Sequence, residues 1–124
     1  RLSVGGHLVF TGRLPAEEIP SFYRGALAVA YVSLFEGFGL PIIEAYACGI
    51  PVLTSNLTAM PEVAGDGALL VNPESLEEIR LGLDRITSDE ALRKELVDGG
   101  RKRLSDFNWD KSAERVWQIV KDVA

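Results

Sequence analysis

The chain is poor in cysteine, histidine and basic residues, and it has no long apolar run. It has one cysteine and one histidine among 124 residues, which excludes an internal disulfide framework and a multi-cysteine zinc site. Lysine and arginine number 13 against 18 aspartates and glutamates, and a net charge of −5 has the wrong sign for a nucleic-acid-binding surface. No apolar run approaches the roughly 20 residues that cross a bilayer. What remains, 47% hydrophobic and 25% charged residues, is typical of one globular domain.

Two features bear on the origin of the chain. It begins at Arg1 rather than at a methionine and shows no signal-peptide pattern, so we expect a fragment or a processed protein. The lone Cys48 lies between two small residues, where we expect a buried, unreactive thiol. A free thiol is consistent with a reducing, cytoplasmic setting.

The two parts of the chain differ in composition. Residues 1–73 contain all six prolines and nine of the twelve glycines but only nine charged side chains, whereas residues 74–124 contain the other twenty-two. We therefore expect short buried strands with tight connections in the first part. In the second part we expect helices with solvated faces.

Apolar runs bounded by turn residues predict four strands. The run over 27–32 shows no alternation, which is typical of a strand covered on both faces in a parallel sheet. The other strands are expected at 8–11, 51–54 and 68–71. Helices are expected over 16–24, 41–48 and 60–64, from Ser75 with Glu78 as a capping box, over a short segment ending at Gly99 and Gly100, and after Asn108 with an inner stripe of Ala113, Val116, Trp117 and Val120. This alternation predicts an α/β fold: a partial doubly wound (Rossmann-like) parallel sheet with flanking helices, followed by C-terminal helices.

A glycine-rich segment follows the second of these strands, at residues 36–44. It lies at the carboxyl end of a strand, where open α/β sheets bind their ligands. Gly37 and Gly39 have no Cβ, so the backbone can bend sharply and approach a ligand closely. The following helix is expected to present unpaired N–H groups at Ile42 and Ile43, which favour an anion such as a diphosphate.

Two carboxylates bracket this segment. Glu36 precedes the helix, and Glu44 is expected in its first turn. Carboxylates beside an electropositive site suit sugar hydroxyls, because an ionised carboxylate accepts hydrogen bonds in fixed directions. One alternative stays open, in which Glu44 only complements the helix dipole and Glu36 is a surface residue. The polar residues Ser55, Asn56 and Thr58 either face the same crevice or form a turn.

Residues 36–44 resemble the E-x7-E motif of the retaining, nucleotide-sugar-dependent glycosyltransferases of family 4, which have the GT-B fold. The similarity continues through 44–52, 55–56, 61–65 and 107–109, and residues 9–12 resemble the strand before the nucleobase loop of that family. The resemblance covers nearly the whole chain. It implies that residues 1–124 are a partial C-terminal, nucleotide-sugar-binding domain, mannosyltransferase-like, without the N-terminal acceptor domain.

The resemblance also implies roles for single residues. Glu36 is the candidate catalytic residue and would contact hydroxyls of the donor sugar, while Glu44 would hold the ribose. Residues 37–40 would line the sugar and diphosphate through their backbone, and residues 12–14 would lie near the base. The implied donor-binding residues are Gly12, Arg13, Leu14, Gly37, Phe38, Gly39, Leu40 and Glu44. The family transfers a hexose of mannose or glucose type, here from a GDP- or UDP-sugar, with no metal or other cofactor.

The partners follow from the same resemblance. The acceptor would be a sugar, glycan or glycolipid held by the missing domain, and the family's basic pair for the diphosphate would lie upstream of Arg1. We therefore expect the isolated chain to be inactive. Peripheral association of the full-length protein with the inner membrane face, and pairing with a second copy, stay open.

Two alternative functions stay open: a nucleotide-sugar epimerase and a non-catalytic nucleotide-sugar-binding module. A dehydrogenase is disfavoured because no G-x-G-x-x-G joins a first strand to a helix. A glycoside hydrolase is disfavoured because the two acids bracket a helix N-terminus.

Overall fold

The computed structural model describes residues 7–123, and in this part of the chain a three-stranded parallel sheet forms the centre. The strands are β1 (Val29–Tyr31), β2 (Val52–Ser55) and β3 (Ala68–Val71), in the order β1-β2-β3. The register pairs Val29 with Val52 and Val52 with Ala68. The predicted α/β class, the parallel sheet and three of the four strands are confirmed.

The predicted strand at 8–11 is wrong. These residues form no strand and are exposed, with Phe10 87% accessible. A strand forms only where a neighbouring strand accepts its backbone hydrogen bonds, and no described strand lies beside this segment. A short apolar run cannot reveal from its own residues whether such a neighbour exists.

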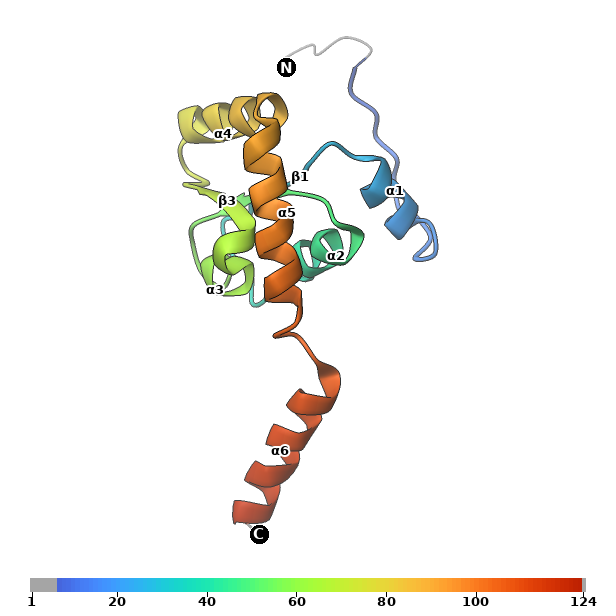
Figure 1. The fold of residues 1–124 in the computed structure, drawn as a ribbon, viewed down its shortest axis with the longest axis vertical. Coiled ribbons are helices and arrows are strands. Elements are labelled where there is room, and N and C mark those ends of the chain that lie inside the picture. Colours follow the sequence, from blue (N-terminus) through green and yellow to red (C-terminus); the bar gives the residue numbers. More distant parts are fainter. Residues whose placement is uncertain (1–6, 124) are drawn as a thin grey trace.

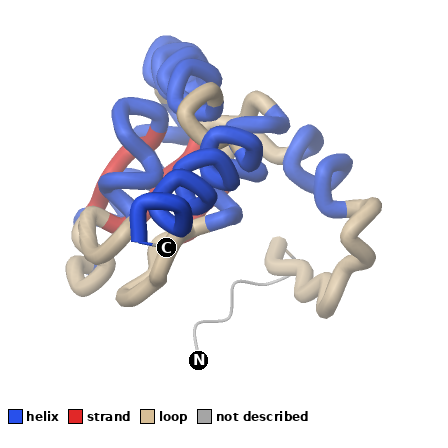
Figure 2. The backbone as a smooth tube through the Cα atoms, turned by 90° about the horizontal axis from the view of Figure 1, so that it is seen from below, coloured by secondary structure: helices blue, strands red, loops and turns tan. Residues whose placement is uncertain are grey.

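Six α-helices and one 3-10 turn accompany the sheet in the described residues, and all but the last helix lie around it (Figure 1). They are α1 (Ile19–Gly25), α2 (Leu40–Cys48), α3 (Met60–Ala64), the 3-10 turn η1 (Gly65–Gly67), α4 (Leu76–Ser88), α5 (Glu90–Leu104) and α6 (Trp109–Val123). Figure 2 shows the strands enclosed among the helices of the main body.

The two faces of the central strand build two separate cores. Val52 belongs to a cluster with residues of α2 and α3, and its neighbour Leu53 belongs to a cluster with residues of β3, α4 and α5. Successive side chains of a strand point to opposite faces, so burial of both positions means that helices cover both sides of β2. This explains why the strand sequences show no polar alternation.

Helix ends follow the predicted chemistry. The Ser75 hydroxyl accepts the Glu78 N–H at 3.2 Å, but the Glu78 carboxylate accepts the Asn72 N–H instead of closing the capping box on Ser75. Gly49 ends α2 with a left-handed φ of 73°. The Asn108 amide oxygen accepts the Asp110 N–H at 2.8 Å and so caps α6, as predicted.

The prediction that a helix ends at Gly99 and Gly100 is wrong, because α5 runs through both to Leu104. A Cβ on Gly100 would lie 2.6 Å from the Tyr46 ring, and one on Gly99 would lie 2.6 Å from the Asp66 carbonyl oxygen. These glycines therefore do not stop the helix. They let α5 pass in close contact with α2 and η1.

Helix α6 stands away from the body (Figure 1). The predicted inner stripe is exposed: Val116 and Trp117 are each 62% accessible and Val120 is 45% accessible. None of the helices in residues 7–123 has the length and apolar character needed to traverse a bilayer.

Candidate functional site

A cleft of about 760 Å³ opens between α1, the loop before it, the start of β1 and the middle of α2. Residues from four parts of the chain meet there. Its lining is Gly12, Arg13, Leu14, Pro15, Ala16, Ile19, Phe22, Tyr23, Ala26, Val29 and Glu44. The lining is mostly apolar and carries one acidic and one basic side chain, which suits a flat ring system with hydroxyl groups at one end.

The cleft brings together part of the predicted site. Residues 12–14 and Glu44 are distant in the sequence and share this lining. Glu36 and residues 37–40 do not line it. The described residues thus divide the predicted site into two places, one at the cleft and one at the loop that precedes α2.

Glu44 is exposed and is the fifth residue of α2, so it lies in the second turn of the helix rather than in the predicted first turn. The Tyr23 hydroxyl donates to its Oε2 at 3.1 Å. Burial, followed by this hydrogen bond and the Glu44 charge, raises the pKa of Tyr23 to about 12. Tyr23 therefore stays protonated and remains a donor at neutral pH.

Glu36 is half-buried and accepts two hydrogen bonds on one oxygen. The Tyr31 hydroxyl donates to Oε1 at 2.5 Å, and the Ser33 hydroxyl donates to the same atom at 3.1 Å. The hydrogen bond to Glu36 is the main cause of a raised pKa for Tyr31. Each acid of the motif thus has a tyrosine as partner. Neither tyrosine was identified from the sequence. The only signal for Tyr31 was its position near the carboxyl end of the predicted strand at 27–32, and Tyr23 had none.

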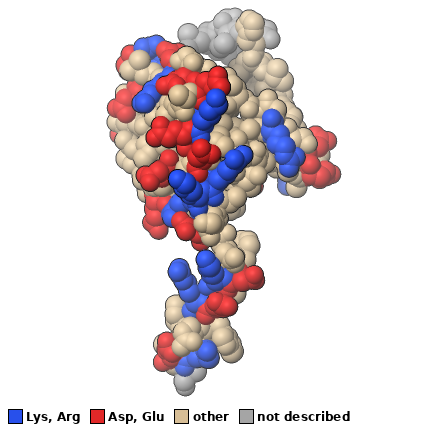
Figure 3. Space-filling view, in the orientation of Figure 1, with Lys and Arg blue, Asp and Glu red and all other residues tan. Residues whose placement is uncertain are grey.

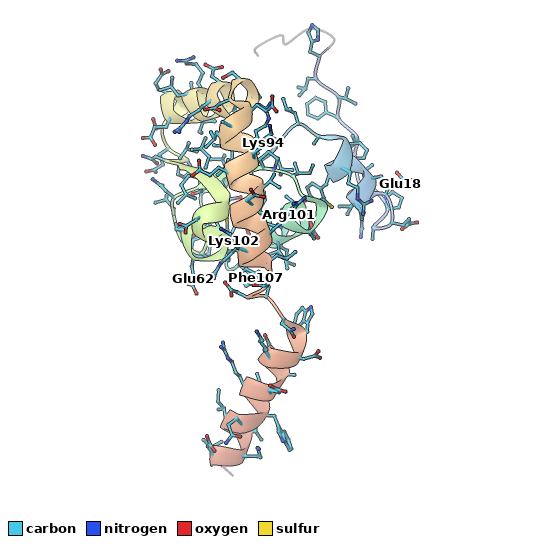
Figure 4. All side chains as sticks on the ribbon, in the orientation of Figure 1. Glu18, Glu62, Lys94, Arg101, Lys102 and Phe107 are labelled. Carbon is cyan, nitrogen blue, oxygen red and sulfur yellow. The ribbon has the colours of Figure 1, made fainter. Side chains whose placement is uncertain are left out.

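The loop between the acids is fixed by packing. Gly39 is buried with φ of 113°, and a Cβ there would lie 2.9 Å from the Met60 methyl group. Phe38 meets the ring of Phe107 edge-on, with centroids 5.8 Å apart. Figure 4 shows Phe107 just below α5, where the chain turns toward α6. Gly39 is therefore required for its conformation and its close contact, and Phe38 is anchored from the far end of the chain.

The helix N-terminus offers fewer N–H groups than predicted. The Ile42 N–H is not unpaired, because it donates to the Gly39 carbonyl at 3.0 Å. Pro41 has no N–H at all. The Ile42 N–H and Pro41 are therefore not available to an anion at this end of α2.

Thr58 in the loop after β2 also contacts this region. Its hydroxyl accepts the Glu36 N–H at 3.3 Å, and its φ of 54° is in the left-handed region. Such a conformation costs a β-branched residue about 1–3 kcal/mol and persists only where its surroundings impose it. Ser55 behaves differently, since its hydroxyl accepts the Leu57 N–H at 3.0 Å and forms a turn.

Charges on the visible face are mixed in sign. In Figure 3 the acidic and basic side chains are interspersed over α4, α5 and α6. Several are paired along their own helix, such as Arg80 with Glu77 at 2.8 Å and with Asp84 at 2.6 Å. These exposed pairs belong to solvated helix faces and add little to stability.

Comparison with known sequences gives a consistent result. Residues 1–103 match the family model described as Glycosyl transferases group 1. The O-antigen chain mannosyltransferase B of Escherichia coli is 36% identical over 116 residues, which cover 94% of this chain and 30% of that protein. The MMP alpha-(1->4)-mannosyltransferase of Mycolicibacterium hassiacum is 38% identical over 112 residues, covering 87% of this chain and 27% of that protein. The chain thus spans about 30% of the length of the first of these relatives.

Solved structures agree with the sequence match. Sucrose-phosphate synthase from Thermosynechococcus elongatus has a TM-score of 0.79 at 31% identity, with 93% of this chain and 30% of that chain covered. The C-terminal domain of a glycosyl transferase group 1 family protein from Francisella tularensis has a TM-score of 0.68 at 33% identity, with 78% and 51% covered. The chain therefore belongs to the glycosyl transferases group 1 family, with the GT-B fold of family 4, and corresponds to the C-terminal, donor-binding domain of that family.

Proposed function

We propose that residues 1–124 form the donor-binding domain of a two-domain retaining glycosyltransferase that transfers a hexose from a nucleotide diphosphate sugar. One observation carries the proposal beyond the family match. The loop at residues 12–14 and the carboxylate of Glu44 line a single cleft, although they are far apart in the sequence. A nucleobase packed against residues 12–14 suits the apolar part of the lining, and a ribose beside Glu44 suits its one carboxylate.

Glu44 is the proposed ribose ligand. Its Oε2 accepts from Tyr23, and its Oε1 accepts no hydrogen bond from residues 7–123. A ribose hydroxyl can donate to that oxygen. Carboxylates accept such bonds more strongly than neutral groups do, because the acceptor is charged.

Glu36 is the proposed catalytic residue, in contact with hydroxyls of the donor sugar. Backbone N–H groups of residues 37–40 would lie along the diphosphate, where the positive end of the α2 dipole favours negative charge. In a front-face transfer the departing diphosphate accepts the proton of the acceptor hydroxyl as the new bond forms on the same face. The protein then contributes positioning and stabilisation of the charge that develops on the leaving group.

The sugar and the acceptor belong to the same proposal. A mannose-type donor is supported by the names of the two mannosyltransferase relatives, and a glucose-type donor by the sucrose-phosphate synthase. We place the acceptor, a sugar, glycan or glycolipid, on a second domain outside residues 1–124. The enzyme would act in the cytoplasm, with an acceptor at the membrane surface as one variant of this proposal.

Titration calorimetry of the two-domain enzyme with GDP, UDP, GDP-mannose and UDP-glucose tests the proposal. We expect one nucleotide and its sugar to bind, and Glu44→Ala to weaken both at least tenfold, while Glu74→Gln at an exposed position away from the cleft changes neither. Failure of all four ligands to bind would reject a nucleotide-sugar site. Conversion of the donor to its epimer without acceptor would favour the epimerase alternative, and NMR of the product anomeric proton checks retention.

A further inference from the structure

The side chain of Glu36 is held asymmetrically. Both of its hydrogen bonds from described residues end on Oε1: one from Tyr31 at 2.5 Å and one from Ser33 at 3.1 Å. Oε2 accepts no hydrogen bond from residues 7–123. A carboxylate can rotate about its last side-chain bond with little resistance. Two donors on Oε1 restrict this rotation and leave Oε2 pointing away from Tyr31 and Ser33.

The two donors are themselves fixed. Tyr31 is the last residue of β1 and pairs with Thr54 in the register of the sheet. The buried Thr54 hydroxyl donates to the Tyr31 carbonyl at 2.7 Å, which fastens the end of the strand to β2. Ser33 follows two residues later on the same segment. Oε1 of Glu36 is therefore held by one donor on the last residue of β1 and by a second donor two positions further along the chain.

The main chain of Glu36 is held from a third direction. Its N–H donates to the Thr58 hydroxyl, and Thr58 keeps a left-handed backbone conformation. Backbone strain of this kind concentrates at functional sites, where the surroundings impose one geometry. The side chain of Glu36 is thus held by the end of β1 and the residue two positions after it, and its backbone by the loop after β2.

We propose that Tyr31 and Ser33 are positioning residues that commit Oε1 of Glu36 to the protein and so direct Oε2 to a hydroxyl of the donor sugar. This inference rests on the proposed function. It makes discrimination of the donor sugar depend on two hydroxyl groups that do not touch the sugar. Without these two hydroxyls, the Glu36 carboxylate would become ordered only when the sugar binds, and this ordering lowers the affinity for the sugar. The contacts with the nucleotide would be unchanged.

The second acid supplies a matched control. Tyr23 donates to Glu44 with the same chemistry, but Glu44 lies in the cleft with the loop at 12–14. Loss of the Tyr23 hydroxyl should affect the nucleoside end, which nucleotide and nucleotide sugar share. Tyr→Phe at positions 31 and 23 therefore makes the same chemical change on two different acids.

The test measures dissociation constants of GDP, GDP-mannose, UDP and UDP-glucose for the two-domain enzyme by calorimetry. For the nucleotide and sugar pair that binds, we expect Tyr31→Phe and Ser33→Ala each to weaken the nucleotide sugar about threefold to tenfold and the double variant more. The nucleotide alone should bind as in the parent protein. Tyr23→Phe should weaken both members of the pair by the same factor, and KM for the donor should rise in the same pattern.

The outcomes separate this inference from the proposed function. Glu36→Gln serves as reference: if it leaves the ratio of the two dissociation constants unchanged, Glu36 has no role at the sugar and the proposed function of that residue fails. If Glu36→Gln changes the ratio while Tyr31→Phe and Ser33→Ala do not, the positioning inference is overturned and the proposed function stands. Binding of none of the four probes would overturn both. Ser33→Ala keeps the test decisive should Tyr31→Phe fail to fold.

Discussion

The ring of Phe107 stands edge-on to the ring of Phe38, with centroids 5.8 Å apart and planes at 90°. The guanidinium of Arg103 lies 5.0 Å from the centroid of the same Phe107 ring. Arg103 also donates to the carbonyls of Glu62 and Val63 at the end of α3. The chain just after α5 thus supports the loop between the two acids of the motif, although some seventy positions separate Phe38 from Phe107 in the sequence.

The first prediction removes this support. Phe107→Ala should lower the free energy of unfolding by about 2 kcal/mol, since it deletes a half-buried ring, an aromatic pair and a cation–π contact. It should also weaken donor binding, because Phe38 loses the partner that fixes its loop. Urea unfolding and calorimetry measure the two effects. Trp109→Ala is the control: Trp109 is 88% exposed, so its loss should change neither quantity, and an equal effect there would contradict the role given to Phe107.

The sequence predicts most of the body because local signals and burial agree there. Pro41 and Gly49 bound α2 as proline and glycine usually do, and the apolar run at 68–71 is a strand at those bounds. The failures are non-local. Phe10 and its neighbours are apolar enough for a strand, but no neighbouring strand in the described residues pairs with them. Gly100 is a residue type that often ends a helix, but here it packs against the Tyr46 ring inside α5. No window of sequence contains the neighbour that decides either case.

The second prediction concerns Gly100. Alanine is the better helix former by about 1 kcal/mol, so a helix-propensity argument expects Gly100→Ala to stabilise the protein. The structure predicts the opposite, a net loss of about 2 kcal/mol, because the new methyl would lie 2.6 Å from the buried Tyr46 ring. That ring cannot move easily, since its hydroxyl donates to the Ala64 carbonyl at 2.9 Å.

Gly25 provides the control for this substitution. A Cβ at Gly25, the last residue of α1, would meet no atom within 4 Å. Gly25→Ala should therefore leave the midpoint of thermal unfolding unchanged or raise it slightly, because it only reduces the freedom of the unfolded chain. A stable Gly100→Ala variant with an undistorted Tyr46 would refute the close packing of α5 on α2.

The third prediction concerns alkaline pH. The folded-state pKa of Tyr23 is raised to about 12, mainly by burial and then by its hydrogen bond to Glu44. Tyrosine in the unfolded chain ionises near pH 10. The stability contributed by this group is therefore fully present below about pH 10 and is lost as the pH rises toward 12. Urea unfolding at a series of pH values should show this decline, and Tyr23→Phe should reduce it.

Glu44→Gln separates the two causes of the raised pKa. The neutral amide removes the charge and weakens the hydrogen bond but leaves the burial. Tyr23 should then titrate below about 12 without returning to 10. Carbon-13 NMR of the labelled ring follows the titration of this residue by itself. An unchanged titration in Glu44→Gln would mean that Tyr23 and Glu44 are not in contact in solution.

The candidate site shows the same division between local and non-local information. Spacing identifies Glu36, Glu44 and the glycines between them, because a bend before a helix N-terminus is encoded within nine residues. It does not identify Tyr31 or Tyr23, whose hydroxyls meet the acids only through the sheet and the packing of α1 on α2. The sequence also predicts an unpaired N–H group at Ile42, whereas in the structure this N–H donates to the Gly39 carbonyl. The candidate residues thus follow from the sequence, whereas the hydrogen bonds that hold their side chains follow from the fold.

The last prediction concerns α6, which has no buried residue. Its exposed apolar side chains include Trp109 and Trp117, so the helix gains no stability from the body that the structure describes. Ending the chain after Asn108 should therefore change the free energy of unfolding by less than about 0.5 kcal/mol and should reduce the binding of a hydrophobic dye. In the intact chain, amide hydrogens of α6 should exchange far faster than those of α5, because a helix of 15 residues without packing is marginal in water. Slow exchange in α6, or a large loss of stability on its removal, would show that another surface covers its apolar face in solution.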